Sequence, residues 1–484
     1  MTPMLTQRLM VLAAAMVLAG CSFAPKYERP AAPVAGDWPA LGLTTFGTGT
    51  APAGTAASAL EWQTFFSDPQ LRKLIEASLT NNRDLRIAVL NIEQARAQFQ
   101  IRRADQFPSV GAAATGSRMP STTGNGTITS AYTAGLAMTS YELDFFGRVA
   151  SLKDAALSQY LATEEGRKTT QITLIASVAN AYLSLLADQE SLAITQQTLD
   201  SREVSLTLSQ LRFDNGVSSE LELRQSQSLV EAARVSLAQL QRQRALDENA
   251  LSLLLGQPLT ADLAVVLPAG QGLADRPVMA DVPAGLPSDL LTLRPDIRQA
   301  EQQLLAANAN IGAARAAFFP KISLTASAGS ASNNLSNLFN SGTYGWTLAP
   351  QLFLPLFDAG RNQAGLDVSK ATRDIAVAQY EKAIQTAFRE VADALAGRAT
   401  LGVQLTAQQA QSTAEAARFK LSDLRYQNGI ANQLELLDAQ RALFAAQQAV
   451  VQTRLLQLQN QVTLYKTLGG GWKEAALTAA PKTP

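Results

Sequence analysis

Two very long stretches without proline constrain most strongly how this chain can fold. They cover residues 147–215 and 360–428. Apolar residues recur within them at spacings of three and four, as at Ile172, Ile175 and Ala179, which is typical of helices that pack in a narrow, coiled-coil-like seam. At about 1.5 Å per residue, each helix would be about 100 Å long. Such helices cannot fold into a compact domain, so we expect them to pack side by side.

The two stretches belong to two copies of one unit. Residues 208–217 match residues 421–430, and the same offset of 213 brings the identical segments 221–223 and 434–436 together. Each copy reads as a helix, a Phe-Pro break, strand-like segments, a Gly-Arg pair, a very long helix, an Asn-Gly break and a second long helix. The constant offset favours duplication over chance similarity between Ala-, Gln- and Leu-rich helices.

The Asn-Gly pairs at 215–216 and 428–429 are expected to end the long helices, because both residue types tolerate the left-handed backbone of a helix C-terminus. Each copy therefore predicts a long helical hairpin with its tip at Asn-Gly. The predicted helices cover about 147–215 and 219–255 in the first copy, and about 360–428 and 432–467 in the second.

Alternating apolar and polar residues predict four strands, with Pro350 marking a bend or a strand end. Alternation over about ten residues is typical of outer-membrane strands, and a soluble hairpin is the alternative. Four strands cannot close around a pore, so an oligomer would have to supply the others. The predicted strands cover about 109–119 and 131–144 in the first copy, and about 321–330 and 343–356 in the second.

Residues 1–20 have the pattern of a signal peptide, with Arg8 before an apolar stretch. The stretch ends in Leu-Ala-Gly-Cys21, which resembles the lipobox of bacterial lipoproteins. Cys21 is the only cysteine, and it would carry a diacylglycerol and an N-acyl chain. An ordinary signal peptide followed by an incidental cysteine is the alternative. No later apolar stretch is long enough to predict a transmembrane helix.

The composition excludes most catalytic chemistry. Among 484 residues there is no histidine and 1 cysteine, which removes imidazole bases, His-ligated metals and internal disulfides. Basic and acidic residues number 40 each, so charge gives no reason to expect a nucleic-acid partner. Residues 469–473 lack the spacing of a phosphate loop. We expect no enzyme activity, cofactor or metal, and we expect Asp144 and Asp358 to cap helix starts.

Four segments carry a resemblance to a known family. They are the LPSDLLTLRPDIRQAE sequence at 286–301, the RYQNGI tip at 425–430, and the helix–strand junctions at 142–148 and 357–361. On these segments the chain resembles the TolC-type outer membrane factor family, in its OprM/NodT-like branch of efflux lipoproteins. The resemblance implies a mainly α fold with a membrane β-barrel, in which a homotrimer forms a 12-stranded outer-membrane barrel continued by a periplasmic α-helical barrel.

The resemblance also implies a function. The chain would be the passive, gated exit duct of a tripartite efflux pump that exports small molecules such as drugs. Its partners would be a periplasmic adaptor, an inner-membrane transporter of the RND type and outer-membrane lipid, without nucleic acid. The expected segments are the signal peptide (1–20), a lipidated extended segment (21–60), the first repeat (61–256), a linker (257–284), the second repeat (285–470) and a tail (471–484).

By the same resemblance, Leu434 and Asp438 constrict the periplasmic aperture. They are four residues apart and therefore share one helix face. Threefold symmetry would place three carboxylates and three apolar side chains near the axis. Arg425, Tyr426 and Arg441 are expected to hold the tips closed. Without the resemblance, Asp438 would be interpreted as a solvated residue on the helix surface, and Leu434 as a residue of the packing seam between helices.

The tips of both hairpins are expected to dock the adaptor. In the first copy Gln225 takes the place of Asp438, which assigns the gate to the second copy. The expected docking residues are Arg212, Asn215, Gly216, Asn428 and Gly429.

Two other functions are alternatives. One is a lipid-anchored periplasmic scaffold without a pore, and the other is an exit duct for protein secretion or metal export.

Overall fold

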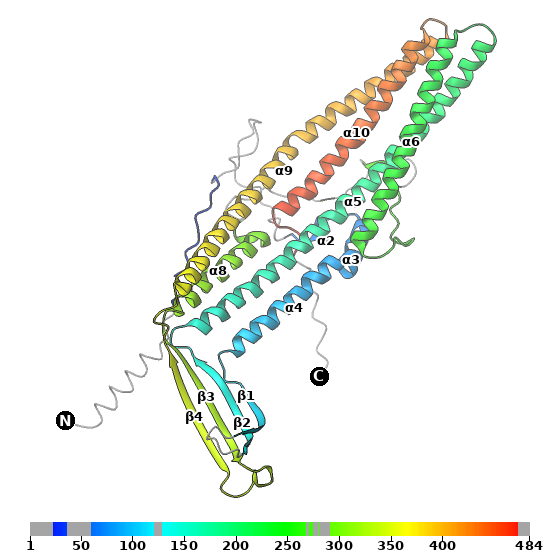
Figure 1. Ribbon diagram of the computed structural model, residues 1–484. Coiled ribbons are helices and arrows are strands. Elements are labelled where there is room, and N and C mark those ends of the chain that lie inside the picture. Colours follow the sequence, from blue (N-terminus) through cyan, green and yellow to red (C-terminus); the bar gives the residue numbers. More distant parts are fainter. Residues whose placement is uncertain are drawn as a thin grey trace, which may run out of the picture. The chain divides into compact units, whose positions relative to one another are not determined.

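The computed structural model describes residues 23–35, 60–120, 128–267, 271–273, 279 and 291–472 (Figure 1). The predicted signal peptide and Cys21 lie outside these residues. The chain divides into two compact units, one of residues 1–32, 90–164 and 299–382, and the other of residues 33–89, 165–298 and 383–484.

The element order repeats, as the sequence predicts. A helix, two strands and a pair of long helices occur first as α4-β1-β2-α5-α6 and again as α8-β3-β4-α9-α10. The long helices α5 and α9 have 67 residues each. The mainly helical, duplicated fold is therefore confirmed. The helices are α2 (Trp62–Phe65), α3 (Pro69–Asn81), α4 (Arg83–Ala104), α5 (Arg148–Asp214), α6 (Glu220–Leu255), α8 (Pro295–Ala316), α9 (Arg361–Gln427) and α10 (Gln433–Thr467).

Acidic side chains cap the two longest helices, as predicted. A carboxylate oxygen of Asp144 accepts a hydrogen bond of 2.7 Å from the backbone N–H of Ala150. Asp358 accepts one of 2.9 Å from the N–H of Asn362. These bonds satisfy N–H groups that have no partner within the first turn of a helix.

The first unit contains a four-stranded antiparallel sheet in the order β1-β2-β3-β4 (Figure 1). Of the bend or strand end predicted at Pro350, the strand end is wrong, because β4 continues to Phe353. Pro350 lies within the strand, opposite Leu324 of β3. Because β4 is an edge strand, one of its sides has no partner among the described residues, and proline is tolerated there. The strands are β1 (Val110–Pro120), β2 (Ile128–Leu143), β3 (Lys321–Ser332) and β4 (Tyr344–Phe353).

The N-terminal segment also packs within the first unit. The Arg29 guanidinium donates to both carboxylate oxygens of Glu301 on α8, at 2.7 and 2.8 Å. The ring of Phe23 stacks on that of Phe319, with centroids 4.5 Å apart. These contacts hold the segment that begins at Phe23 against α8 and against the residues that follow this helix.

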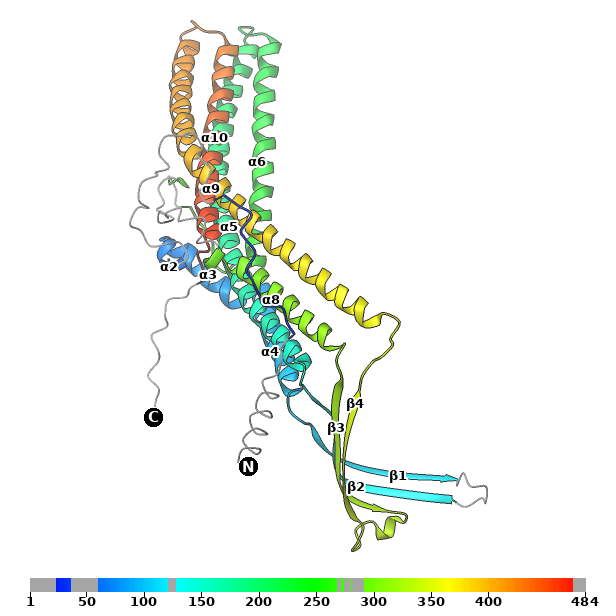
Figure 2. The ribbon, with the colours of Figure 1, turned by 90° about the vertical axis from the view of Figure 1, so that its left-hand side faces the viewer.

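In the second unit, the two helical hairpins lie side by side, as Figure 2 shows for α6, α9, α10 and the end of α5. Glutamine side chains of α10 donate to small polar groups of α5. Gln448 reaches the Thr195 hydroxyl at 3.2 Å, and Gln459 reaches the Ser184 hydroxyl at 3.2 Å. The small residues of α5 let α10 approach closely enough for these bonds to form.

Among the described helices, α5 alone contains a stretch long and apolar enough to cross a membrane. Inside the protein, 67% of that stretch is buried. A core helix has the same property, so this stretch is weak support for a transmembrane helix.

Candidate functional site

The sheet of the first unit has one apolar and one polar face. Leu136, Ala328 and Trp346 form a row across three strands on one face. On the other face the hydroxyls of Ser327 and Thr347 share a hydrogen bond of 2.7 Å. Trp346 is 71% exposed, so no described residue covers this part of the apolar face. This two-faced alternation is typical of the wall of a membrane barrel.

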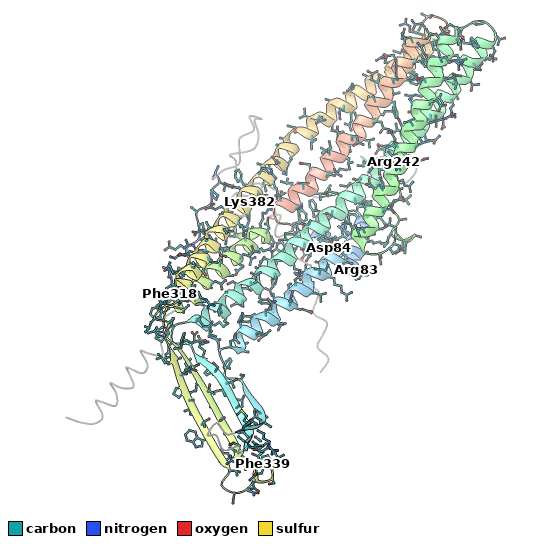
Figure 3. All side chains as sticks on the ribbon, viewed as in Figure 1. Arg83, Asp84, Arg242, Phe318, Phe339 and Lys382 are labelled. Carbon is teal, nitrogen blue, oxygen red and sulfur yellow. The ribbon has the colours of Figure 1, made fainter. Side chains whose placement is uncertain are left out.

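Aromatic side chains lie at both ends of the sheet. Figure 3 shows Phe318 where α8 leads into β3, and Phe339 in the loop between β3 and β4 at the far end. Both are exposed, at 40% and 79%. Aromatic residues at the two ends of an apolar band match the two interfaces of a bilayer.

The first hairpin tip has the backbone geometry that its Asn-Gly pair predicts. Gly216 has a φ of 71°, and the N–H of Val217 donates to the carbonyl of Arg212 at 2.8 Å. This bond belongs to the Schellman motif, which ends many helices. The Asn215 side chain donates to the carbonyl of Leu211 at 2.7 Å, so it caps the helix.

The second tip repeats this geometry. Gly429 also has a φ of 71°, and the N–H of Ile430 donates to the carbonyl of Arg425 at 2.9 Å. Asn428 donates to the carbonyl of Leu424 at 2.7 Å. The predicted docking residues Asn215, Gly216, Asn428 and Gly429 therefore shape the backbone of the two turns.

Asp438 of α10 lies between two guanidinium groups. It forms a salt bridge to Arg418 of α9, and Arg441 lies 3.6 Å from its other oxygen. The side chain of Asp438 is 56% exposed, so each pair is largely solvated. Leu434, one turn earlier, is 55% exposed. Asp438 and Leu434 are thus accessible on α10, and Asp438 ties that helix to α9.

The other gate candidates link different elements. Arg425 lies 3.5 Å from the carboxylate of Glu435 and so connects the two helices of the second hairpin. Tyr426 is buried, and the guanidinium of Arg212 lies 5.0 Å from the centre of its ring. This cation–π contact joins the first hairpin to the second.

Two residues at the second tip were not predicted from the sequence. Arg418 is one. Its position along the chain could have identified it, because Arg418 and Asp438 are equally far from Asn428, where the hairpin turns, and two such residues lie opposite each other in an antiparallel hairpin. Gln433 is the other. Its amide donates to the Ser209 hydroxyl at 3.0 Å and to the carbonyl of Glu222 at 3.2 Å, which ties α10 to α5 and α6.

A pair of carboxylates, Asp188 and Asp247, lies in the same unit, farther along the first hairpin from its tip. Asp188 of α5 lies close to Asp247 of α6. Burial, followed by the nearby carboxylate of Asp247 and its negative charge, raises the pKa of Asp188 to about 7. Arg244 partly opposes the shift.

Nowhere in the part of the chain that the structure describes do three or more carboxylate or thiol groups come together as metal ligands would.

Comparison with known proteins gives consistent matches. The family model "Outer membrane efflux protein" matches residues 74–257 and 286–470. The toluene efflux pump outer membrane protein TtgC of Pseudomonas putida is 50% identical over 476 residues, which are 97% of each chain. The outer membrane protein OprJ of Pseudomonas aeruginosa is 46% identical over 466 residues, 95% of each.

A solved structure also resembles this chain. The open state of the MtrE outer membrane channel of Neisseria gonorrhoeae aligns with a TM-score of 0.83 at 40% sequence identity. The alignment covers 94% of this chain and 99% of that one.

Proposed function

Because this chain belongs to the outer membrane efflux protein family, we propose that it is the passive exit duct of a tripartite pump that exports small molecules across the outer membrane. The TtgC relative is named for toluene efflux. Its 50% identity supports a cargo of small apolar or amphiphilic compounds. Energy would come from the partner transporter, to which a periplasmic adaptor joins the duct.

The observation that carries this proposal is the two-faced sheet. An apolar face toward lipid and a polar face toward water are what the wall of a water-filled barrel requires. The sheet has two edge strands, β1 and β4, and each has one neighbouring strand in the part of the chain that the structure describes. Three copies that pair edge to edge would contribute twelve strands, which supports a homotrimer.

The gate would lie at the tip of the second hairpin. Leu434 and Asp438 are exposed on α10, as residues that face a pore must be. The ion pairs of Asp438 and Arg425 would hold the two helices of this hairpin together in the closed gate. The contact of Tyr426 with Arg212 would hold the second hairpin against the first hairpin. The two tips, with their matching turns, would present Arg212 and the Asn-Gly pairs to the adaptor.

The anchor would be lipid on Cys21. Phe23, two residues later, stacks on Phe319 where α8 ends and the chain enters β3. Acyl chains on Cys21 would therefore begin close to the sheet. More than one chain is needed for stable anchoring, as a diacylglycerol and an N-acyl group provide.

Planar-bilayer conductance of the purified full chain tests the proposal. Discrete, reproducible current steps are expected from a duct. Protein that assembles in detergent and inserts, yet gives no steps, would contradict the duct and favour the scaffold without a pore.

A further inference from the structure

A buried arginine joins three of the long helices in the second unit. Arg202 of α5 is 5% exposed, and its Nη1 donates to the carbonyl of Leu229 on α6 at 2.9 Å. Its guanidinium carbon lies 5.4 Å from the centre of the Phe444 ring on α10. Arg202 therefore connects the two helices of the first hairpin and also reaches the second hairpin.

Arg202 is not balanced by an acid. No described carboxylate forms a salt bridge with its guanidinium, and its Nε bonds to no described acceptor. Burial, followed by the positive charge of Arg441, lowers the pKa of Arg202. A buried guanidinium without a carboxylate is unfavourable for folding. On the side of α10, the π face of Phe444 is the group that attracts this charge.

The packing of the repeat does not account for this contact. At the offset of 213, Glu415 takes the place of Arg202 in the second copy, and Glu231 takes the place of Phe444 in the first. Neither the cation nor the aromatic ring is therefore part of the repeated pattern. The contact joins two different copies, as a device that holds one hairpin against the other must.

The contact lies near the proposed gate. Phe444 follows Asp438 by six residues on α10, which is a rise of about 9 Å. Arg441, which lies 3.6 Å from Asp438, is one turn from Phe444. At the tip, Arg212 of α5 lies 5.0 Å from the ring of Tyr426. Two cations of α5 thus each face an aromatic ring of the second hairpin.

We propose that Arg202 is a positioning residue of the gate, which clamps α10 to the first hairpin through the ring of Phe444. It is the buried one of the two cation–π contacts, and the Arg212–Tyr426 pair is the one at the tip. Movement of α10 away from α5 would take the ring from a buried cation, so the contact favours closed tips. The role in gating rests on the proposed function, whereas the clamp can be measured without a current.

The distance between the two tips tests the clamp. Spin labels at Val217→Cys and Ile430→Cys, which replace side chains that are 67% and 70% exposed, report this distance in the full chain. Labelled chains are diluted into unlabelled ones, so that distances within one chain are measured, and the chain without the two new cysteines gives the background. Arg202→Met should raise the ratio of long to short distances about fivefold or more, because a cation–π contact is lost.

The matched control is Arg167→Met, the same change on the same helix. The Arg167 guanidinium donates to the side chain of Gln171, one turn away on α5, at 3.0 Å. This variant should leave the distances between the tips unchanged. Unchanged distances in Arg202→Met would overturn the proposal, and so would an equal shift in the control.

Further variants separate a clamp from ordinary core packing. Arg202→Lys, which keeps a cation for the ring, should restore most of the short distances. Phe444→Leu should act as Arg202→Met does, and the double variant should shift the distances no further. Arg202→Met should melt no lower than the wild type, because the unpaired charge is gone. A lower melting temperature with wild-type distances would mean that Arg202 serves packing alone. If Arg202→Met fails to assemble, unchanged distances in Phe444→Leu would contradict the clamp.

Planar-bilayer recording separates the clamp from the duct. Arg202→Met should have a higher open probability than the wild type. Longer distances with an unchanged open probability would contradict a role in gating. Longer distances without current from either protein would confirm the clamp and contradict the proposed duct.

Discussion

At the scale of residues, the Asp438 carboxylate holds the two helices of the second hairpin together through Arg418. The pair is exposed, with 42% of the Arg418 side chain and 56% of the Asp438 side chain accessible. Exposed ion pairs contribute about 0.2–1 kcal/mol each. If the second hairpin forms the proposed gate, an interaction of that size would favour the closed state without locking it.

Arg418→Ala should therefore raise the open probability of the channel up to about fivefold, which corresponds to the loss of about 1 kcal/mol. The control is Arg389→Ala, which removes another exposed arginine of α9, 3.9 Å from Asp393. Single-channel recording of both variants is the measurement. Identical traces from the two variants would contradict a gating role for Arg418.

The site could be predicted from the sequence only in part. Leu434 and Asp438 are near neighbours on one helix, so a motif identifies them together. Arg418 lies on the other helix of the hairpin, and nothing local to α10 points to it. Tyr426 and Arg212 meet across two repeats, a contact that depends on how the hairpins align and that no single motif contains.

At the scale of elements, β2 and β3 approach so closely that each places a glycine at the contact. A Cβ on Gly135 would lie 2.4 Å from the carbonyl oxygen of Ala328, opposite Gly329. Gly135→Ala should destabilise the sheet by about 1–3 kcal/mol, because the clash is with backbone that cannot move away easily.

The fraction of folded protein measures this effect. It can be read from electrophoresis, because the mobility of a folded membrane barrel changes when the sample is heated. Gly345→Ala in β4 is the control, since nothing lies within 4 Å of its added Cβ. A normal folded fraction in Gly135→Ala would show that β2 and β3 can separate, contrary to the observed packing.

The hairpin formed by α5 and α6 should be sensitive to pH through Asp188. Its pKa in the folded protein, about 7, lies above the ordinary value of an aspartate, so the folded state binds more protons between pH 4 and 7. Stability is therefore full below about pH 4 and falls as the pH rises to 7. Partial exposure limits the loss to the order of 1 kcal/mol.

Asp188→Asn should remove this dependence. Thermal unfolding at several pH values is the measurement, and the variant should melt at a higher temperature than the wild type at pH 8 but not at pH 4. A variant that is less stable than the wild type at pH 8 would mean that the charged pair stabilises the hairpin.

Periodicity and proline-free length predicted the long helices, because these features act locally. The strands were harder to predict. In the sequence, Pro350 indicates a bend or a strand end, but tolerance of proline depends on whether a strand is at the edge of its sheet. The irregular pairing of β2 between Met138 and Tyr141, near Ser140 with a φ of 54°, is likewise a property of the paired strands and not of one segment.

At the scale of the whole molecule, duplication gives each chain two strand pairs and two hairpins, joined through the β2–β3 pairing. One chain leaves the outer sides of β1 and β4 without a partner within the described residues. The sequence predicts that more copies are needed but not how many, because closure depends on strand tilt and stagger between chains. The expected trimer therefore derives from the family resemblance.

A passive duct that is shut at the tip of the second hairpin should conduct more when the residues proposed to shut it are removed. The deciding measurement is planar-bilayer conductance of the wild type against the Leu434→Ala, Asp438→Ala double variant. We predict small current steps from the wild type and larger, longer steps from the double variant. Equal steps from the two proteins would contradict a gate at these residues.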